Sequence, residues 1–112
     1  MTADTSFPWE VTPEQVQAQQ NPYVIVDVRE DWERTLASLP HVFPCPLATL
    51  LSQEETLKKR AQTHTLYVLC HHGVRSLRVT RFLRERGFTS AQSMAGGIEA
   101  WALEIDAGTP RY

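Results

Sequence analysis

The sequence predicts an α/β fold with a mostly parallel sheet. Two apolar runs, residues 23–28 and 66–70, are rich in β-branched and aromatic residues and are typical of strands buried on both faces. Segments with helical periodicity separate the expected strands, and each strand–helix unit spans about twenty residues. This alternation favours parallel strands joined by helical crossovers, with helices on both faces of the sheet.

Length and composition indicate one ordinary globular domain. The chain has 112 residues, of which 42% are hydrophobic and 21% charged, and its formal net charge is −2. This charge argues against a nucleic-acid binder. No apolar run reaches the ~18 residues needed to span a membrane, and the first residues lack the pattern of a secretory signal. Two cysteines cannot form a disulfide framework, so we expect a reducing compartment, the cytoplasm.

The N-terminal part contains a short strand and a capped helix. We expect residues 1–8 to be a flexible lead and residues 9–112 to form the domain. Trp9-Glu10-Val11 is a very short candidate strand. A helix should follow it, with Thr12 as cap, Pro13 in the first turn and Gln15 completing a capping box. Asn21-Pro22 should end that helix.

The middle of the chain alternates strands and helices. After the strand at 23–28 we expect a short helix at 29–36 and a short extended segment at 42–46, whose prolines suit a sheet edge or strand end. Residues 50–61 read as an amphipathic helix with three leucines inside and basic residues in the last turn. The three leucines are Leu50, Leu51 and Leu57.

The C-terminal part repeats this alternation. The strand at 66–70 leads through a short loop into a helix at about 74–86, which Gly87 should stop. Residues 88–94 contain a further short strand. Gly96-Gly97 should then make a tight turn into a helix over residues 98–103.

Chemically informative residues follow two of the buried strands at their carboxyl ends, where parallel sheets bind ligands. Cys70 ends one strand, and the loop His71-His72-Gly73 leads directly into a helix. Such a loop can turn its backbone N–H groups inward as an anion-binding nest, and the helix start adds partial positive charge. Together with the Arg75 guanidinium, these features favour a thiolate at Cys70. Asp27 and Arg29 end the other strand.

Four motifs of the chain resemble the rhodanese family of sulfurtransferases, and the resemblance covers about residues 11–112. The pattern Cys-x-x-x-x-Arg at 70–75 is similar to the active-site loop of that family. Thr-Pro-Glu at 12–14 resembles its opening helix, Val-Asp-Val-Arg-Glu at 26–30 its Asp-x-Arg signature, and residues 94–101 its Gly-Gly-x-x-x-Trp closing motif. The resemblance implies a central, mostly parallel five-stranded sheet with helices on both faces.

The resemblance also implies a chemistry. Cys70 would attack the outer sulfur of a donor such as thiosulfate and become a persulfide, and a thiol or cyanide-like acceptor would then take that sulfur. A thioredoxin or a sulfur-carrier protein would be a suitable protein partner, and no cofactor, nucleic acid or membrane is implied. The loop residues that bind substrate would be His71, His72, Gly73, Val74 and Arg75. Asp27 and Arg29 would brace this loop.

Two alternatives remain open at this point. Phosphatases and arsenate reductases of the same fold have one more residue between cysteine and arginine, so that their loop surrounds a tetrahedral oxyanion. The loop from Cys70 to Arg75 is the shorter kind, which fits a single sulfur better. The second alternative is a non-enzymatic rhodanese-like binding module, and such modules lack the cysteine.

Several other residues have an ordinary structural interpretation. Asp27 and Arg29 suit an ion pair, and Cys45 suits a packed core position, although a resolving thiol for a Cys70 persulfide is the other reading. The adjacent His71 and His72 have no spaced partner motif, so we expect no metal site. Their side chains should face the mouth of the loop, and whether either one acts directly is left open.

Overall fold

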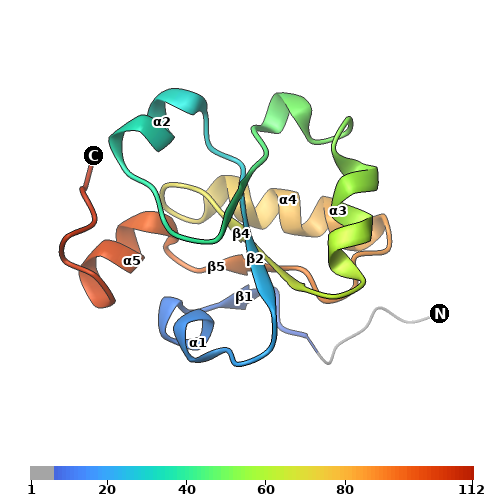
Figure 1. Cartoon of the computed structure of the whole chain (residues 1–112), viewed down its shortest axis with the longest axis horizontal. Coiled ribbons are helices and arrows are strands. Elements are labelled where there is room, and N and C mark those ends of the chain that lie inside the picture. The colour runs from blue at the N-terminus through green and yellow to red at the C-terminus, as the bar shows by residue number, and fades with distance from the viewer. Residues whose placement is uncertain (1–6) are drawn as a thin grey trace.

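The computed structural model describes residues 7–112, so residues 1–6 of the expected N-terminal lead lie outside the described residues. Its centre is a five-stranded parallel sheet with the strand order β1-β5-β4-β2-β3 (Figure 1). The strands are β1 (Glu10–Val11), β2 (Tyr23–Asp27), β3 (Val42–Pro44), β4 (Thr65–Leu69) and β5 (Gln92–Met94). The predicted parallel α/β sheet is therefore confirmed.

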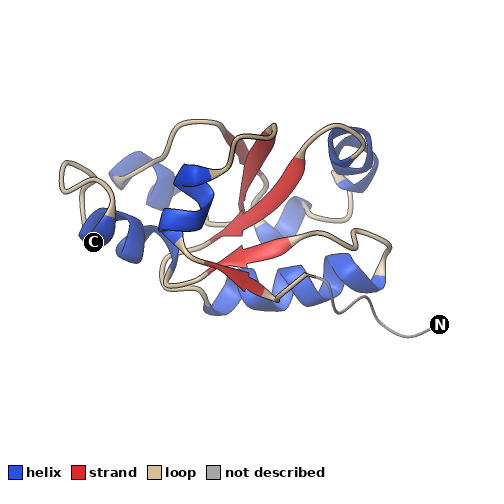
Figure 2. Cartoon of the chain, turned by 90° about the horizontal axis from the view of Figure 1, so that it is seen from below, coloured by secondary structure: helices blue, strands red, loops and turns tan. Residues whose placement is uncertain are grey.

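Helices cover both faces of this sheet, as predicted (Figure 2). They are α1 (Pro13–Ala18), α2 (Asp31–Leu36), α3 (Glu54–Ala61), α4 (Val74–Glu85) and α5 (Gly97–Glu104), and a 3₁₀ turn, η1, spans Leu47–Thr49. One core cluster joins the sheet to α3 and α4, and the other joins it to α1 and α5. No helix among residues 7–112 is both long enough and apolar enough to cross a membrane.

Strand β2 shows why the apolar runs are continuous. Val24 and Val26 pack in the cluster with α3 and α4, whereas Ile25 between them packs in the cluster with α1 and α5. Successive side chains of a strand point to opposite faces. A strand that is covered on both faces therefore has no position for a polar residue before its carboxyl end. Asp27 is the last residue of β2.

The predicted helix ends are confirmed where local chemistry fixes them. The Thr12 hydroxyl accepts the Gln15 N–H at 3.1 Å, and the Gln15 side chain accepts the Thr12 N–H at 2.9 Å, which is the expected capping box. Gly87 follows α4 with φ +98°, a conformation that glycine adopts without strain.

The predicted helix over residues 50–61 is partly wrong. Helix α3 begins only at Glu54, because the chain first forms the η1 turn and further turns after it. Leu50 and Leu57 are buried as expected, but Leu51 is 67% exposed. Tight turns before the helix change the direction of its side chains, so helical periodicity does not apply at Leu51.

Candidate active site

Cys70 follows β4 at the carboxyl edge of the sheet. It is 1% exposed, and the short loop after it enters α4 at Gly73. Gly73 has φ +100°, and a Cβ there would press against the backbone N of Gly96. Only glycine takes this conformation at low cost, and the conformation turns the Gly73 N–H back toward the cysteine.

The Cys70 sulfur lies in a polar cradle. The backbone N–H groups of Gly73 and Ser76 donate to Sγ at 3.0 and 3.3 Å. The Ser76 hydroxyl lies 3.3 Å from Sγ, where it accepts the thiol proton, and it is 2.7 Å from the Ser93 hydroxyl. Backbone donors aimed at one sulfur favour a negative charge on it. The geometry thus suits a thiolate.

Further donors surround the same loop. Within residues 7–112, the backbone N–H groups of His71, His72, Val74 and Arg75 have no hydrogen-bond acceptor. The first turn of α4 also carries no acidic residue. The helix start therefore keeps its partial positive charge for a ligand. Of the five loop residues that were predicted to bind substrate, Gly73 already donates its N–H to the sulfur, and the other four have backbone N–H groups without an acceptor.

Helix α5 supports the loop from behind. The Ile98 and Glu99 N–H groups donate to the carbonyl oxygens of Cys70 and His71 at 3.0 and 3.1 Å. A Cβ at Gly97 would overlap both of these carbonyl oxygens. The second glycine of the pair is therefore required by the close approach of two backbones, and this contact leaves the loop N–H groups free to face the other way.

The Arg75 side chain is paired with a carboxylate that the sequence analysis did not anticipate. Its guanidinium binds Glu33 of α2 through two hydrogen bonds of 2.7 and 2.8 Å, and the Tyr112 hydroxyl donates to the same carboxylate at 2.9 Å. The bond from Arg75 lowers the pKa of Glu33 to about 2, against a desolvation that raises it. Arg75 therefore contributes a shared charge and a fixed position rather than a free cation.

Asp27 and Arg29 form a fully buried ion pair, with hydrogen bonds of 3.0 and 2.7 Å. Arg29 also donates to the Ala37 carbonyl at 3.0 Å and to the Tyr112 hydroxyl at 2.9 Å. The pair thereby links the end of β2 to α2, and through Tyr112 to the carboxylate of Glu33. Neither residue has a hydrogen bond to the Cys70 sulfur among those within the described residues.

The two histidines of the loop are stacked. The rings of His71 and His72 lie 3.9 Å apart, and Tyr112 stacks on the other face of His71 at 3.8 Å. Burial, and next the nearby His72, lower the pKa of His71. The Nε2 atom of His71 is buried without a hydrogen-bond partner among the described residues.

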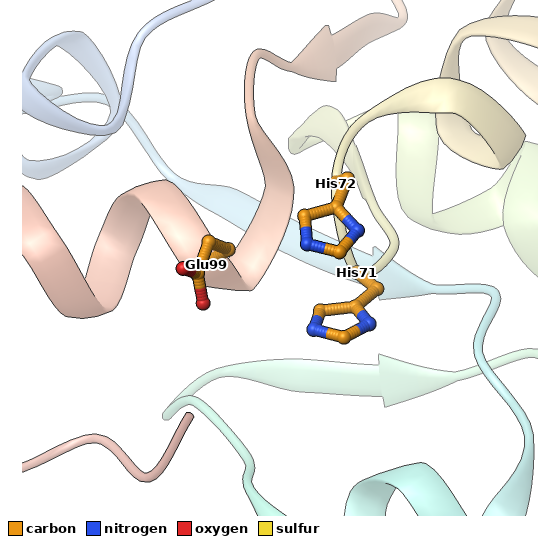
Figure 3. A group of neighbouring side chains, drawn as sticks. All are labelled: His71, His72 and Glu99. Carbon is orange, nitrogen blue, oxygen red and sulfur yellow. The ribbon is translucent and has the colours of Figure 1, made fainter. Parts of the chain in front are cut away.

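The same histidines lie near Glu99, and Figure 3 shows the three side chains together. One potential ligand atom from each lies within 4.8 Å of the others. The lone pairs of two stacked rings run nearly parallel, however, and cannot both point at one ion at the ~2.1 Å that zinc requires. The Glu99 carboxylate moreover accepts two hydrogen bonds from Arg111. The arrangement therefore suits a metal ion poorly.

Cys45 lies in the same core cluster as Cys70 but in different surroundings. It is fully buried directly after β3, and burial raises the pKa of its thiol. In the sheet register Asp27 of β2 pairs with Pro44 of β3 on one side and with Leu69 of β4 on the other. Cys45 and Cys70 are the next residues of those two chains and therefore flank Val28, which places them two strand spacings apart, about 9 to 10 Å. Disulfides require Cα atoms within about 7 Å. Cys45 is thus badly placed to resolve a Cys70 persulfide.

The sequence analysis missed four residues of the site: Glu33, Ser76, Ser93 and Tyr112. Ser76 directly follows the loop motif, so its N–H belongs to the same helix start and could have been found. The other three come from distant segments, and no local pattern marks them.

Comparison with known proteins gives a consistent result. The sequence model of the rhodanese-like domain family matches residues 12–104. The chain is 34% identical over 92 residues to a putative sulfurtransferase of Bacillus subtilis, YtwF, covering 81% of this chain and 84% of that protein. The rhodanese-like domain protein from Staphylococcus aureus superimposes with a TM-score of 0.70 at 27% identity, covering 92% of this chain and 97% of that one.

A second group of relatives is much longer. The chain is 36% identical over 95 residues to the maize protein named adenylyltransferase and sulfurtransferase MOCS3-1, which covers 81% of this chain but 20% of that protein. Its counterpart in Arabidopsis thaliana is 33% identical over 103 residues. The chain thus spans about a fifth of the length of these curated relatives.

Proposed function

Because the chain belongs to the rhodanese-like domain family, we propose that it is a sulfurtransferase that carries a sulfane sulfur on Cys70 as a persulfide. The observation that carries the proposal is the pair of backbone N–H groups, from Gly73 and Ser76, that donate to a buried sulfur. An inert buried cysteine needs no such donors, whereas a thiolate nucleophile does.

In the first half-reaction the Cys70 thiolate attacks the outer sulfur of a donor such as thiosulfate. The sulfur–sulfur bond of the donor breaks, sulfite leaves with the electron pair, and Cys70 becomes a persulfide anion. The unused N–H groups of His71, His72, Val74 and Arg75 would hold the outer sulfur. Preorganised donors of this kind are worth ~3 kcal/mol each in the best cases.

In the second half-reaction a thiol or cyanide-like acceptor attacks that outer sulfur. The bond between the two sulfurs breaks, and its electron pair returns to Cys70 as the thiolate. The chain's own groups suffice for this cycle, so we propose no cofactor. We place the protein in a reducing compartment such as the cytoplasm, where thiol acceptors remain reduced. A thioredoxin or a sulfur-carrier protein is a suitable protein acceptor.

The side chains of Arg75, Asp27 and Arg29 act on the loop rather than on the sulfur. Arg75 fixes the start of α4 against α2 through Glu33, and the Asp27–Arg29 pair holds α2 and Tyr112 in place. We propose that this network keeps the loop in the shape that turns its N–H groups inward. Positioning of this kind contributes because a loose ring of donors loses most of its effect on charge.

Steady-state kinetics with thiosulfate and cyanide test the proposal. A persulfide carrier predicts parallel double-reciprocal lines, since the donor product leaves before the acceptor binds. An aryl phosphate, assayed in parallel, should show negligible turnover because the short loop fits one sulfur. Absence of sulfur transfer, or faster hydrolysis of the aryl phosphate than transfer of sulfur, would overturn the proposed function.

A further inference from the structure

A cavity of about 420 Å³ lies beside the Cys70 loop. It is lined by residues of β1, of the loop and of the first two turns of α4, namely Glu10, His72, Gly73, Val74, Leu77, Arg78 and Arg81. Gly73 is shared by the cavity and the sulfur cradle, since its N–H donates to Cys70 Sγ at 3.0 Å. A carboxylate bound in the cavity would therefore lie beside the loop that holds the reactive sulfur. The volume is within the range of small-molecule sites.

The cavity has two cations without carboxylate partners. Arg78 and Arg81 are three residues apart on α4 and therefore lie on the same side of the helix. Neither forms an ion pair or hydrogen bond with a carboxylate within residues 7–112. Five other arginines do pair with carboxylates: Arg29, Arg34, Arg75, Arg86 and Arg111. Arg78 and Arg81 thus supply the positive charge of the cavity lining.

The other lining residues narrow the ligand class. Val74 is 63% exposed, and with Leu77 it gives the cavity an apolar strip between the loop and the arginines. The Arg81 guanidinium lies 5.7 Å from the Trp9 ring, which restricts where it can move. Glu10 is the single carboxylate of the lining. A small organic anion with a short hydrocarbon part fits this combination better than a bare inorganic ion.

We propose that this cavity is an acceptor subsite, in which Arg78 and Arg81 bind the carboxylates of a small thiol that removes sulfur from Cys70. The proposal rests on the proposed function. The acceptor thiolate attacks the outer sulfur of the Cys70 persulfide and itself becomes a persulfide. The electron pair of the broken sulfur–sulfur bond returns to the Cys70 sulfur, so no oxidant or reductant is consumed. The two arginines would give preference to dicarboxylate thiols over neutral ones.

The test begins from persulfidated protein, prepared with thiosulfate and freed of excess donor. Discharge is followed by intact mass with either mercaptosuccinate, which has two carboxylates, or 2-mercaptoethanol, which is neutral. The double variant Arg78→Gln/Arg81→Gln should discharge to mercaptosuccinate about tenfold more slowly, and added salt should reduce that difference. Discharge to 2-mercaptoethanol should change by less than about twofold.

Three further variants isolate the effect of position. Lys59→Gln/Arg60→Gln removes the same charge from exposed residues at the end of α3 and should match the unmodified protein. Arg78→Lys/Arg81→Lys keeps the charge and should restore most of the rate with mercaptosuccinate. Glu10→Gln removes the opposing carboxylate and should increase that rate about twofold.

The outcomes separate the two proposals. If no persulfide forms on the unmodified protein, the proposed function is wrong and the subsite falls with it. If persulfide forms normally but the glutamine variants slow both thiols equally, or slow neither, the subsite alone is wrong. If Lys59→Gln/Arg60→Gln slows discharge to mercaptosuccinate as much as Arg78→Gln/Arg81→Gln does, the effect comes from net charge and not from the cavity. That result would also overturn the subsite.

Discussion

The two cysteines of this chain are alike in burial and different in chemistry. Cys70 and Cys45 are 1% and 0% exposed, each follows a strand at the same edge of the sheet, and both belong to one core cluster. The Cys70 sulfur receives two backbone N–H groups. For Cys45, burial dominates and raises the pKa of the thiol. Burial alone therefore does not indicate the function of a cysteine, and the donors around the sulfur do.

The origin of the difference is the segment that follows each cysteine. Cys70 is followed by a glycine-containing loop and then a helix of 12 residues, and the N–H groups of Gly73 and Ser76 at this helix start donate to the sulfur. Cys45 is followed by Pro46, which has no N–H, and then by the short η1 turn. The first arrangement provides an anion site and the second provides a packed thiol.

The largest expected effect separates the two cysteines by substitution. Cys70→Ser should lower thiosulfate-to-cyanide transfer by at least about 1,000-fold, because an oxygen cannot carry the sulfane sulfur. Cys45→Ser should retain transfer within about threefold, apart from any loss of stability from a polar group in the core. Both are measured as kcat/KM together with a thermal unfolding curve. Full activity in Cys70→Ser would assign the carrier role to Cys45.

Chemical labelling compares the thiols in the unmodified protein. We expect iodoacetamide to alkylate Cys70 at least about 10-fold faster than Cys45 at pH 6 to 7, because two backbone N–H groups donate to the Cys70 sulfur whereas burial raises the pKa of the Cys45 thiol. Peptide mapping after timed quenching gives both rates from one sample. Equal rates that rise together only above pH 8 would contradict the role given to the cradle.

The support from α5 can be removed without touching either cysteine. Gly97→Ala should cost about 2 to 4 kcal/mol of stability, because its Cβ would overlap the Cys70 and His71 carbonyl oxygens. It should also slow labelling of Cys70 while leaving that of Cys45 unchanged. Gly87→Ala is the matched control: its φ is +98° but a Cβ there meets no atom within 4 Å, so only about 1 kcal/mol should be lost. Equal effects at the two glycines would refute the close-packing argument.

The last prediction concerns Glu33, the carboxylate that binds Arg75. The pKa of Glu33 is lowered from 4.5 to about 2 in the folded protein, mainly by Arg75. A lowered pKa adds stability above pH 4.5 that disappears as the pH falls toward 2, up to about 3 kcal/mol. Glu33→Gln should be less stable at pH 7, and the gap to the unmodified protein should close over this interval in urea titrations. If the difference in stability between the two proteins does not change with pH, Glu33 contributes through its packing and not through its charge.

Much of this molecule follows from local sequence, and the parts that do not are long-range. The buried strands were predictable because a strand covered on both faces must be apolar throughout, and the loop from Cys70 to Arg75 because its residues are contiguous. The partner of Arg75 was not predictable, since Glu33 is 42 residues away and Tyr112 joins it from 79 residues away. The prediction of a helix before Glu54 was wrong because consecutive tight turns occupy these residues, and side chains in such turns do not follow helical periodicity.

The most direct test of the central claim is the intact mass of the protein after incubation with thiosulfate. The unmodified chain and Cys45→Ser should each gain the mass of one sulfur, and cyanide should remove it. Cys70→Ser should gain nothing under the same conditions. A sulfur that appears on Cys70→Ser, or an unmodified chain that gains none while it remains folded, would contradict the assignment of Cys70 as the persulfide carrier.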